Sequence, residues 1–126
     1  MLQERDKLSD AVIGRAIEVH RHLGPGLLES AYEECLCHEL ACAGIAHRRQ
    51  VNLPVTYKGH RLDMDYRLDV VVQECLVVEI KATEKLLPIH EAQVITYLRL
   101  SGIPVGLLLN FNAVVLKSGI RRLMLP

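Results

Sequence analysis

Apolar and polar residues alternate strictly over residues 62–70, and this period of two is typical of a half-buried β-strand. The polar side of this strand carries Asp69. A second apolar run, over residues 76–82, indicates another strand, on which Glu79 and Lys81 share one face. The pattern therefore brings two acids and a lysine onto neighbouring strands.

Only three residues separate the two strand patterns, so we expect a hairpin that pairs Val72 with Leu76. That register sets Asp69 directly opposite Glu79, with Cβ atoms roughly 5 Å apart. Two bare carboxylates this close repel each other, so without a cation at least one should take up a proton or be held by hydrogen bonds, whereas a divalent cation removes the conflict. Lys81 follows about 6.6 Å further along the strand, within reach of a phosphate or an attacking water.

Spacing alone leaves a second interpretation of this hairpin open. In it, Asp69, Glu79 and Lys81 are solvated residues on the open face of an antiparallel hairpin, where Glu79 and Lys81 pair with their neighbours. An acid, a second acid ten residues later and a nearby lysine form a loose pattern, which does not decide between the two interpretations.

Three helices are predicted from apolar stripes with helical spacing. The first begins with Ser9 as its N-cap and ends at Gly24, the second runs from about Leu27 to Gly44, and the third opens at Pro88. In order, the stripes are Val12, Ala16, Val19 and Leu23; Leu28, Tyr32, Leu36 and Leu40; and Ile89, Ala92, Gln93, Thr96, Tyr97 and Leu100.

The remaining strands are predicted before and after the third helix in the sequence. A turn at Lys58-Gly59 joins the early strands to the hairpin, and a turn at Ser118-Gly119 precedes the last strand. The additional strand segments are residues 46–53, 55–58, 105–110, 113–117 and 120–123. This order predicts an α/β (α+β) domain with a central mixed sheet flanked by helices.

Three helix residues have simple structural interpretations beside functional ones. Glu29 lies in the first turn of the second helix, where the helix dipole favours an acid without any catalytic role. Tyr32 is expected to pack, with its hydroxyl hydrogen-bonded. Gln93 lies inside an apolar stripe and must find partners, which a metal-bound water, the strand of Glu79 and Lys81, or a backbone carbonyl would provide.

Composition limits the class of protein. The chain has 126 residues, half of them apolar, which predicts a single domain over residues 1–126. No apolar run is long enough to span a membrane and residues 1–8 do not resemble a signal peptide, so a cytoplasmic location is expected. Cys35, His38 and Cys42 have helical spacing, but core packing explains these cysteines better than zinc does.

The charges are balanced overall but unevenly distributed. Fifteen basic residues match fifteen acidic ones, which argues against an indiscriminate polyanion binder. Residues 1–44 hold only four of the basic residues and eight of the acids, so residues 45–126 are net basic and could meet phosphates. With one Phe and four Tyr, no stacking platform for nucleobases is expected.

Several motifs occur in an order that resembles the GxxExxY family of the PD-(D/E)XK nuclease-like superfamily. They run from about Ser9 to the C-terminus, and the position before Asp69 is Leu68 in place of the proline in the superfamily name. The motifs are His20-Arg21-His22-Leu23-Gly24-Pro25-Gly26, Gly26-Leu27-Leu28-Glu29-Ser30-Ala31-Tyr32, Arg67-Leu68-Asp69, Val78-Glu79-Ile80-Lys81, Ala92-Gln93 leading to Tyr97-Leu98, and Gly106-Leu107-Leu108-Leu109-Asn110-Phe111-Asn112.

The resemblance implies a restriction-endonuclease-like αβββαβ core and metal-dependent phosphodiester chemistry. By this analogy Mg²⁺ or Mn²⁺ is the cofactor, and Lys81 is the catalytic lysine. The ligands of the metal ion would be Asp69, Glu79, the Ile80 carbonyl and Glu29, and Glu29 would complete the site from the second helix. The segment from Gln93 to Tyr97 resembles the Q-x-x-x-Y motif of exonuclease-like members, which adds both residues to the catalytic group.

The expected function is that of a metal-dependent nuclease acting on nucleic acid, with DNA favoured over RNA. The alternative is a catalytically inactive nuclease-fold protein that serves as a binding module or scaffold. A homodimer is also conceivable, because the third helix carries Val94, Ile95 and Leu98 outside its main stripe and could be buried or form an interface.

Overall fold

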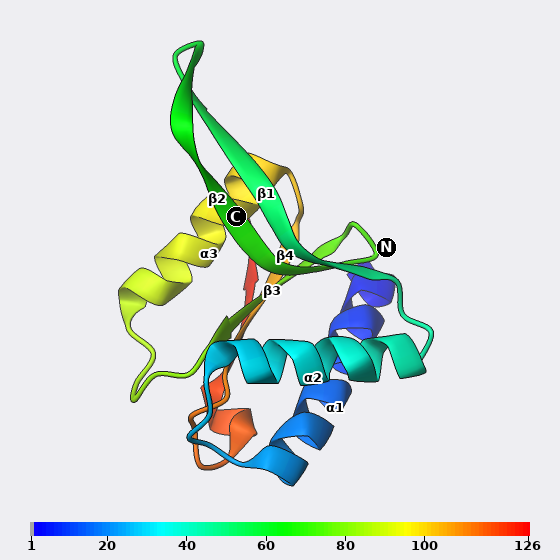
Figure 1. The fold of residues 1–126 in the computed structure, drawn as a ribbon. Helices are drawn as coiled ribbons and strands as arrows, with labels where there is room; N and C mark the ends of the chain where they lie inside the picture. Colours follow the sequence, from blue (N-terminus) through cyan, green and yellow to red (C-terminus); the bar gives the residue numbers. More distant parts are fainter. Residues whose placement is uncertain (1) are drawn as a thin grey trace.

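The computed structural model describes residues 2–126, and side chains from residue 7 onward (Figure 1). These residues form three long helices and five strands, with one short 3₁₀ turn. The elements are α1 (Leu2–Leu23), α2 (Glu29–Cys42), β1 (His47–Tyr57), β2 (His60–Val72), β3 (Leu76–Lys81), α3 (Pro88–Ser101), β4 (Val105–Asn110), η1 (Leu116–Gly119) and β5 (Ile120–Met124).

The five strands form one mixed sheet in the order β1-β2-β3-β4-β5. β3 and β4 are parallel, and the other neighbouring pairs are antiparallel. A parallel pair needs a crossover connection, and α3 supplies it between β3 and β4. The segment from α2 to β4 has the predicted αβββαβ order, with α1 before it and β5 after it, so the fold class is confirmed.

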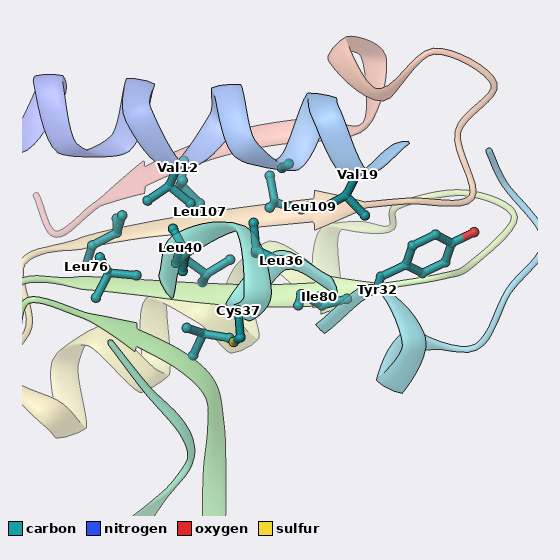
Figure 2. Packing of buried hydrophobic residues seen from close by; sticks show 14 of the residues in the cluster. Val12, Val19, Tyr32, Leu36, Cys37, Leu40, Leu76, Ile80, Leu107 and Leu109 are labelled. Carbon is teal, nitrogen blue, oxygen red and sulfur yellow. The ribbon is translucent and has the colours of Figure 1, made fainter. Parts of the chain in front are cut away.

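The helices cover both faces of the sheet and create two cores. α1 and α2 lie on one face, where Val12, Leu36, Ile80 and Leu109 belong to one buried cluster (Figure 2). α3 covers the other face with a smaller cluster, whose buried members are Leu53, Leu68, Val71, Val77, Val94, Tyr97, Leu98 and Leu108. No helix in residues 2–126 is both long and apolar enough to cross a membrane.

The predicted start of the first helix is wrong. Ser9 is fully buried well inside α1, which already begins at Leu2. Leu8 packs against the core one turn before Val12, so the apolar stripe continues toward the N-terminus and the helix with it.

Two strand predictions also need correction. The two strands predicted at residues 46–53 and 55–58 are one continuous strand, β1 (His47–Tyr57), whose pairing shifts register between Pro54 and Thr56. Because β1 is an edge strand, it tolerates the proline. Residues 113–117 are not a strand. Both sides of β4 are already paired, so residues 113–115 form a loop and residues 116–117 begin η1; the Ala113 carbonyl contacts His20 Nε2 at 2.8 Å.

The predicted core stripe of the third helix is largely wrong. Val94, Tyr97 and Leu98 are the buried residues of α3, whereas Ile89 is 67% exposed and Leu100 is 43% exposed. Gly106 of β4 lets the helix approach closely, because a Cβ there would lie 2.7 Å from Val94 Cγ1. The contact with β4 therefore selects the Val94 side of the helix for burial.

Replacing Gly106 with alanine should destabilise the protein by about 1–3 kcal/mol, because α3 has to move away from the sheet. Gly14→Ala is the matched control. A Cβ on this exposed helical glycine meets nothing within 4 Å, so the alanine should stabilise the protein by roughly 0.5–1 kcal/mol. Urea denaturation of both variants checks the pair, and equal stability changes would contradict this view of how α3 packs.

Candidate functional site

The hairpin between β2 and β3 has the predicted register up to one step before the acids. Val72 pairs with Leu76 and Val70 with Val78, and the ladder then ends. The next step in this register leads to Asp69 and Glu79. Here the Asp69 carboxylate replaces the backbone partner, because its Oδ2 accepts a hydrogen bond of 2.8 Å from the Ile80 amide.

The alternation of β2 breaks at the same point. Val70 and Val72 face the core under α1 and α2, but Leu68 faces the core under α3, where regular alternation would place it on the same side as Val70. The predicted single apolar face over residues 62–70 is therefore wrong. Asp69 lies between Leu68 and Val70, where the side of β2 that carries the apolar residues changes from one face of the sheet to the other. The outer half of the β1–β2 hairpin projects beyond the sheet (Figure 1).

A matching irregularity occurs in the neighbouring strand. Arg49 pairs with Val70 and Val51 with Leu68, so Gln50 stands opposite Asp69 but forms no ladder pair with it. Gln50 has a φ of +49°, in the left-handed region that residues other than glycine rarely adopt. Strained backbone of this kind persists only when the surroundings hold it in place.

Glu33 of α2 holds this irregularity. Arg49 donates two hydrogen bonds to Glu33 Oε2, at 3.1 and 3.0 Å, and Gln50 donates one of 2.7 Å to Oε1. Consecutive residues of a regular strand point to opposite faces, so both reach Glu33 only because Gln50 is left-handed. The sequence prediction missed Glu33, although its spacing to Leu36 and Leu40 places it on the apolar face of α2.

Glu79 is the buried acid of the site. It is 5% exposed, and its Oε1 is buried without a hydrogen-bond partner. Burial, and then the neighbouring charge of Asp69, raise the pKa of Glu79 to about 9, while the charge of Lys81 acts in the opposite direction. Burial and the neighbouring acid therefore both favour the protonated form of the Glu79 carboxyl.

Lys81 and two residues of α3 complete the cluster. Lys81 Nζ donates a hydrogen bond of 3.3 Å to Gln93 Oε1, so of the three partners that the sequence left open for this glutamine, the strand of Glu79 and Lys81 supplies one. The pKa of the Tyr97 hydroxyl is raised by burial and then by the charges of Glu79 and Asp69. Tyr97 therefore remains a neutral hydrogen-bond donor close to both acids.

The Ile80 carbonyl points toward Asp69. In an extended strand the N–H and C=O of one residue point to the same side, and those of the next residue to the other. Because the Ile80 amide donates to Asp69, the Ile80 carbonyl also lies on the β2 side. The Lys81 carbonyl accordingly faces β4, where it accepts a hydrogen bond of 2.9 Å from the Phe111 amide.

Glu29 does not join this cluster. It is exposed in the first turn of α2, on the face of the sheet opposite to α3. Tyr32, one turn later, stacks on Phe111 with ring centroids 4.6 Å apart, so Glu29 lies at the same end of the sheet as Lys81. Over the described side chains, no three His, Cys, Asp or Glu residues converge to hold a metal ion.

Tyr32 has the packing role that the sequence predicts. Its ring is fully buried, and its hydroxyl donates a hydrogen bond of 2.6 Å to the Gly24 carbonyl. The same hydroxyl accepts a hydrogen bond of 3.0 Å from the Leu27 amide. Tyr32 therefore fixes the loop between α1 and α2, and with it the position of the helix end that carries Glu29.

Asn110 is a second residue that sequence reasoning missed. It pairs with Lys81 in the parallel ladder and is 4% exposed. Its side chain accepts hydrogen bonds from the Thr83 and Asn112 amides and donates one of 2.9 Å to the Thr83 carbonyl. Asn110 thus fixes the chain directly after Lys81; the sequence signals were its place in one of the quoted motifs and a polar residue at the end of an apolar strand.

The arrangement satisfies one test for a divalent cation. A buried carboxylate oxygen without a hydrogen-bond partner is rare in folded proteins, and a bound cation or a proton would satisfy it. Glu79 Oε1, the Asp69 carboxylate and the Ile80 carbonyl offer only oxygen atoms, which are the ligands that Mg²⁺ and Mn²⁺ prefer. Magnesium commonly uses one or two carboxylates and completes its shell with water, so two acids suffice.

Comparison with known protein families gives the class of this fold and site. A family model described as the PD-(D/E)XK nuclease superfamily matches residues 6–123. The chain therefore belongs to the PD-(D/E)XK nuclease superfamily. Neither curated proteins nor solved structures gave a match.

The raised pKa of Glu79 predicts a pH-dependent stability in the absence of metal. The stabilisation is fully present below the ordinary pKa of about 4.5 and is lost as the pH rises toward 9, by at most about 1.4 kcal/mol per pH unit. Glu79→Gln cannot lose a proton, so its melting temperature in EDTA should fall less between pH 5 and pH 9 than that of the wild type.

Glu74→Gln is the matched control, since Glu74 is an exposed acid that pairs with Arg48 at the surface. Its pH profile should follow the wild type. If Glu79→Gln also follows the wild type, then Glu79 does not hold a proton in the folded state.

Proposed function

We propose that this protein is a metal-dependent nuclease that hydrolyses phosphodiester bonds of nucleic acid. The observation that carries the proposal is that Oε1 of the buried Glu79 has no hydrogen-bond partner. Glu79 lies beside Asp69 and two residues before Lys81 on β3. This combination of two acids and a lysine at one strand end is what the superfamily resemblance implies for a catalytic centre. The same resemblance favours DNA over RNA.

The ion would be Mg²⁺ or Mn²⁺, held by Asp69, Glu79 and the Ile80 carbonyl, with water at the other positions. Glu29 would act through water from the first turn of α2, because its side chain is exposed at the end of the sheet where Lys81 lies. When bound, the ion lowers the pKa of a water molecule and neutralises charge on the phosphate. Glu79 has to give up its proton to serve as a ligand.

The other residues position and neutralise the substrate. The Lys81 ammonium is held by Gln93 Oε1 and places a positive charge where the phosphate becomes more negative. Gln93 also orients the nucleophile, with its amide fixed between Lys81 and Tyr97. Tyr97 keeps its proton and can donate a hydrogen bond to a phosphate oxygen or to water.

We place the chain in the GxxExxY family within this superfamily. Gly26, Glu29 and Tyr32 are the residues that carry the name, and two of them have roles that the geometry supports. Gly26 has a φ of +104°, which excludes most other residues, and Tyr32 fastens the loop in which it lies.

One observation favours the alternative of a catalytically inactive binding or scaffold protein. Glu29 is exposed and stays apart from Asp69 and Glu79, so the cluster contains two acids where the resemblance implies three. A scaffold would not require the ion, and it would tolerate Asp69→Asn without losing its partner.

Cleavage assays separate these functions. Labelled single-stranded and duplex DNA and RNA are incubated with Mg²⁺, Mn²⁺ or EDTA and with wild type, Glu79→Ala, Lys81→Ala or Lys85→Ala protein. Cleavage should require the metal and should fall on the order of 100-fold or more in Glu79→Ala and in Lys81→Ala. Lys85→Ala removes a lysine of the same segment from an exposed position and should cut like the wild type.

Unchanged cleavage by the first two variants would contradict the roles given to Glu79 and Lys81. No cleavage of any substrate by folded wild-type protein, with either metal, would contradict the nuclease proposal and favour the binding module.

A further inference from the structure

An apolar groove lies between the projecting half of the β1–β2 hairpin and α3, on the face of the sheet that carries Lys81. Its volume is about 350 Å³. The hairpin and the helix contribute three residues each that matter here: Val55, Leu62 and Tyr66, and Ile89, Thr96 and Leu100. In Figure 1 the hairpin and α3 lie beside each other at this place.

The groove is continuous with the candidate catalytic cluster. Gln93 and Tyr97 line it, and both belong to that cluster. Gln93 holds Lys81 at 3.3 Å, while Tyr97 is close enough to Glu79 for the charge of this acid to act on its hydroxyl. A ligand in the groove therefore lies next to whatever Lys81 binds.

The exposed lining is unusually apolar for a surface. Ile89 is 67% exposed, and Leu100 and Tyr66 are each 43% exposed. Four tyrosines scattered along the sequence predict no stacking platform, but the fold brings two of them together. The rings of Tyr66 and Tyr97 lie 6.2 Å apart and are tilted by 49°.

We propose that the groove receives one unpaired nucleobase of the substrate, packed against Tyr66, with the adjoining phosphate at Lys81. This inference rests on the proposed nuclease function and names its substrate class. A flat, apolar-faced base suits the aromatic and aliphatic walls, and Gln93 and Thr96 offer hydrogen bonds to its polar edge. A paired base inside a duplex is already stacked on both faces and cannot enter.

The substrate is therefore single-stranded nucleic acid, or a strand end or flap whose bases are unpaired. Stacking on an aromatic side chain tolerates any base, so the groove gives preference for strand state and not for sequence. The rival occupant is a second copy of the chain, which would bury the same apolar residues in a homodimer.

The test measures binding in EDTA, where catalysis plays no part. Fluorescence anisotropy at one fixed salt concentration compares an end-labelled oligothymidylate of about eight nucleotides with a chain of equal length and charge whose sugars carry no bases. The wild type should bind the oligothymidylate about tenfold more tightly than the abasic chain.

Tyr66→Ala should abolish this discrimination between the two chains. Tyr57→Ala is the matched control, because Tyr57 lies on the same hairpin, is 63% exposed and does not line the groove. It should keep the full tenfold ratio. Ile89→Ser supplies a second variant from the helix side, and circular dichroism checks that each variant is folded.

Equal binding of both chains by the wild type, including failure to bind either, would overturn the proposal. An equal effect of Tyr66→Ala and Tyr57→Ala on the affinity ratio of the two chains would also overturn it, since the bases would then contact the hairpin outside the groove. Light scattering that shows a wild-type dimer converted to a monomer by Leu62→Glu would assign the groove to a second copy.

The outcomes remain separate from those of the cleavage assay. Metal-dependent cutting without base discrimination leaves a nuclease that binds its substrate elsewhere. Base discrimination without cutting leaves a binding protein for unpaired strands.

Discussion

The interruption of strand pairing at Gln50 and Asp69 is the constraint on which the rest of the site depends. In regular pairing the backbone groups around Asp69 and Ile80 would hydrogen-bond to each other, and β2 would stay paired with β3 along its length. The left-handed Gln50 breaks the β1–β2 ladder opposite Asp69, and the β2–β3 ladder ends one pair away. The Asp69 carboxylate can then bind the Ile80 amide and stand beside Glu79.

The same interruption turns the outer hairpin toward α3. Leu68 and Tyr66 face the helix, although Val70 of the same strand faces the opposite core. One irregularity therefore shapes both the acid pair and the apolar groove next to it. Its anchor is Glu33, a buried acid of α2 whose charge is balanced by a direct ion pair with Arg49.

Burial of Glu79 gives this site its electrostatic character. A carboxyl that is removed from water and set beside a second acid prefers its protonated form, so the folded protein bears a cost whenever the proton leaves. A cation that replaces the proton removes this cost. Under the proposed function, cation binding at Glu79 would therefore stabilise the folded protein.

The sequence predicted the parts of this structure that depend on local pattern. The pairing of Val72 with Leu76 followed from the short connection, and the bond between Gln93 and Lys81 followed from the need of a glutamine for partners. The turn at Lys58-Gly59 is also where the pattern placed it. Each of these depends on neighbours along the chain or on one strand pair.

The predictions that failed depend on contacts between distant segments. Gln50 carries no local signal for a left-handed backbone, which is set by Glu33 from another layer. Ile89 and Leu100 have core-like spacing, but Gly106 of β4 draws the Val94 side of α3 onto the sheet instead. The catalytic and metal-binding roles of Asp69, Glu79, Glu29, Ile80, Lys81, Gln93 and Tyr97 stay predictions.

We propose that the left-handed backbone at Gln50 positions Asp69 and Glu79 to hold a metal ion, and Mn²⁺ binding measured by electron paramagnetic resonance tests this claim most directly. Gln50→Gly permits the left-handed backbone and should bind Mn²⁺ like the wild type, whereas Gln50→Val disfavours it and should bind about tenfold more weakly. Equal affinity of the two folded variants would contradict the claim, as would wild-type protein that binds no Mn²⁺.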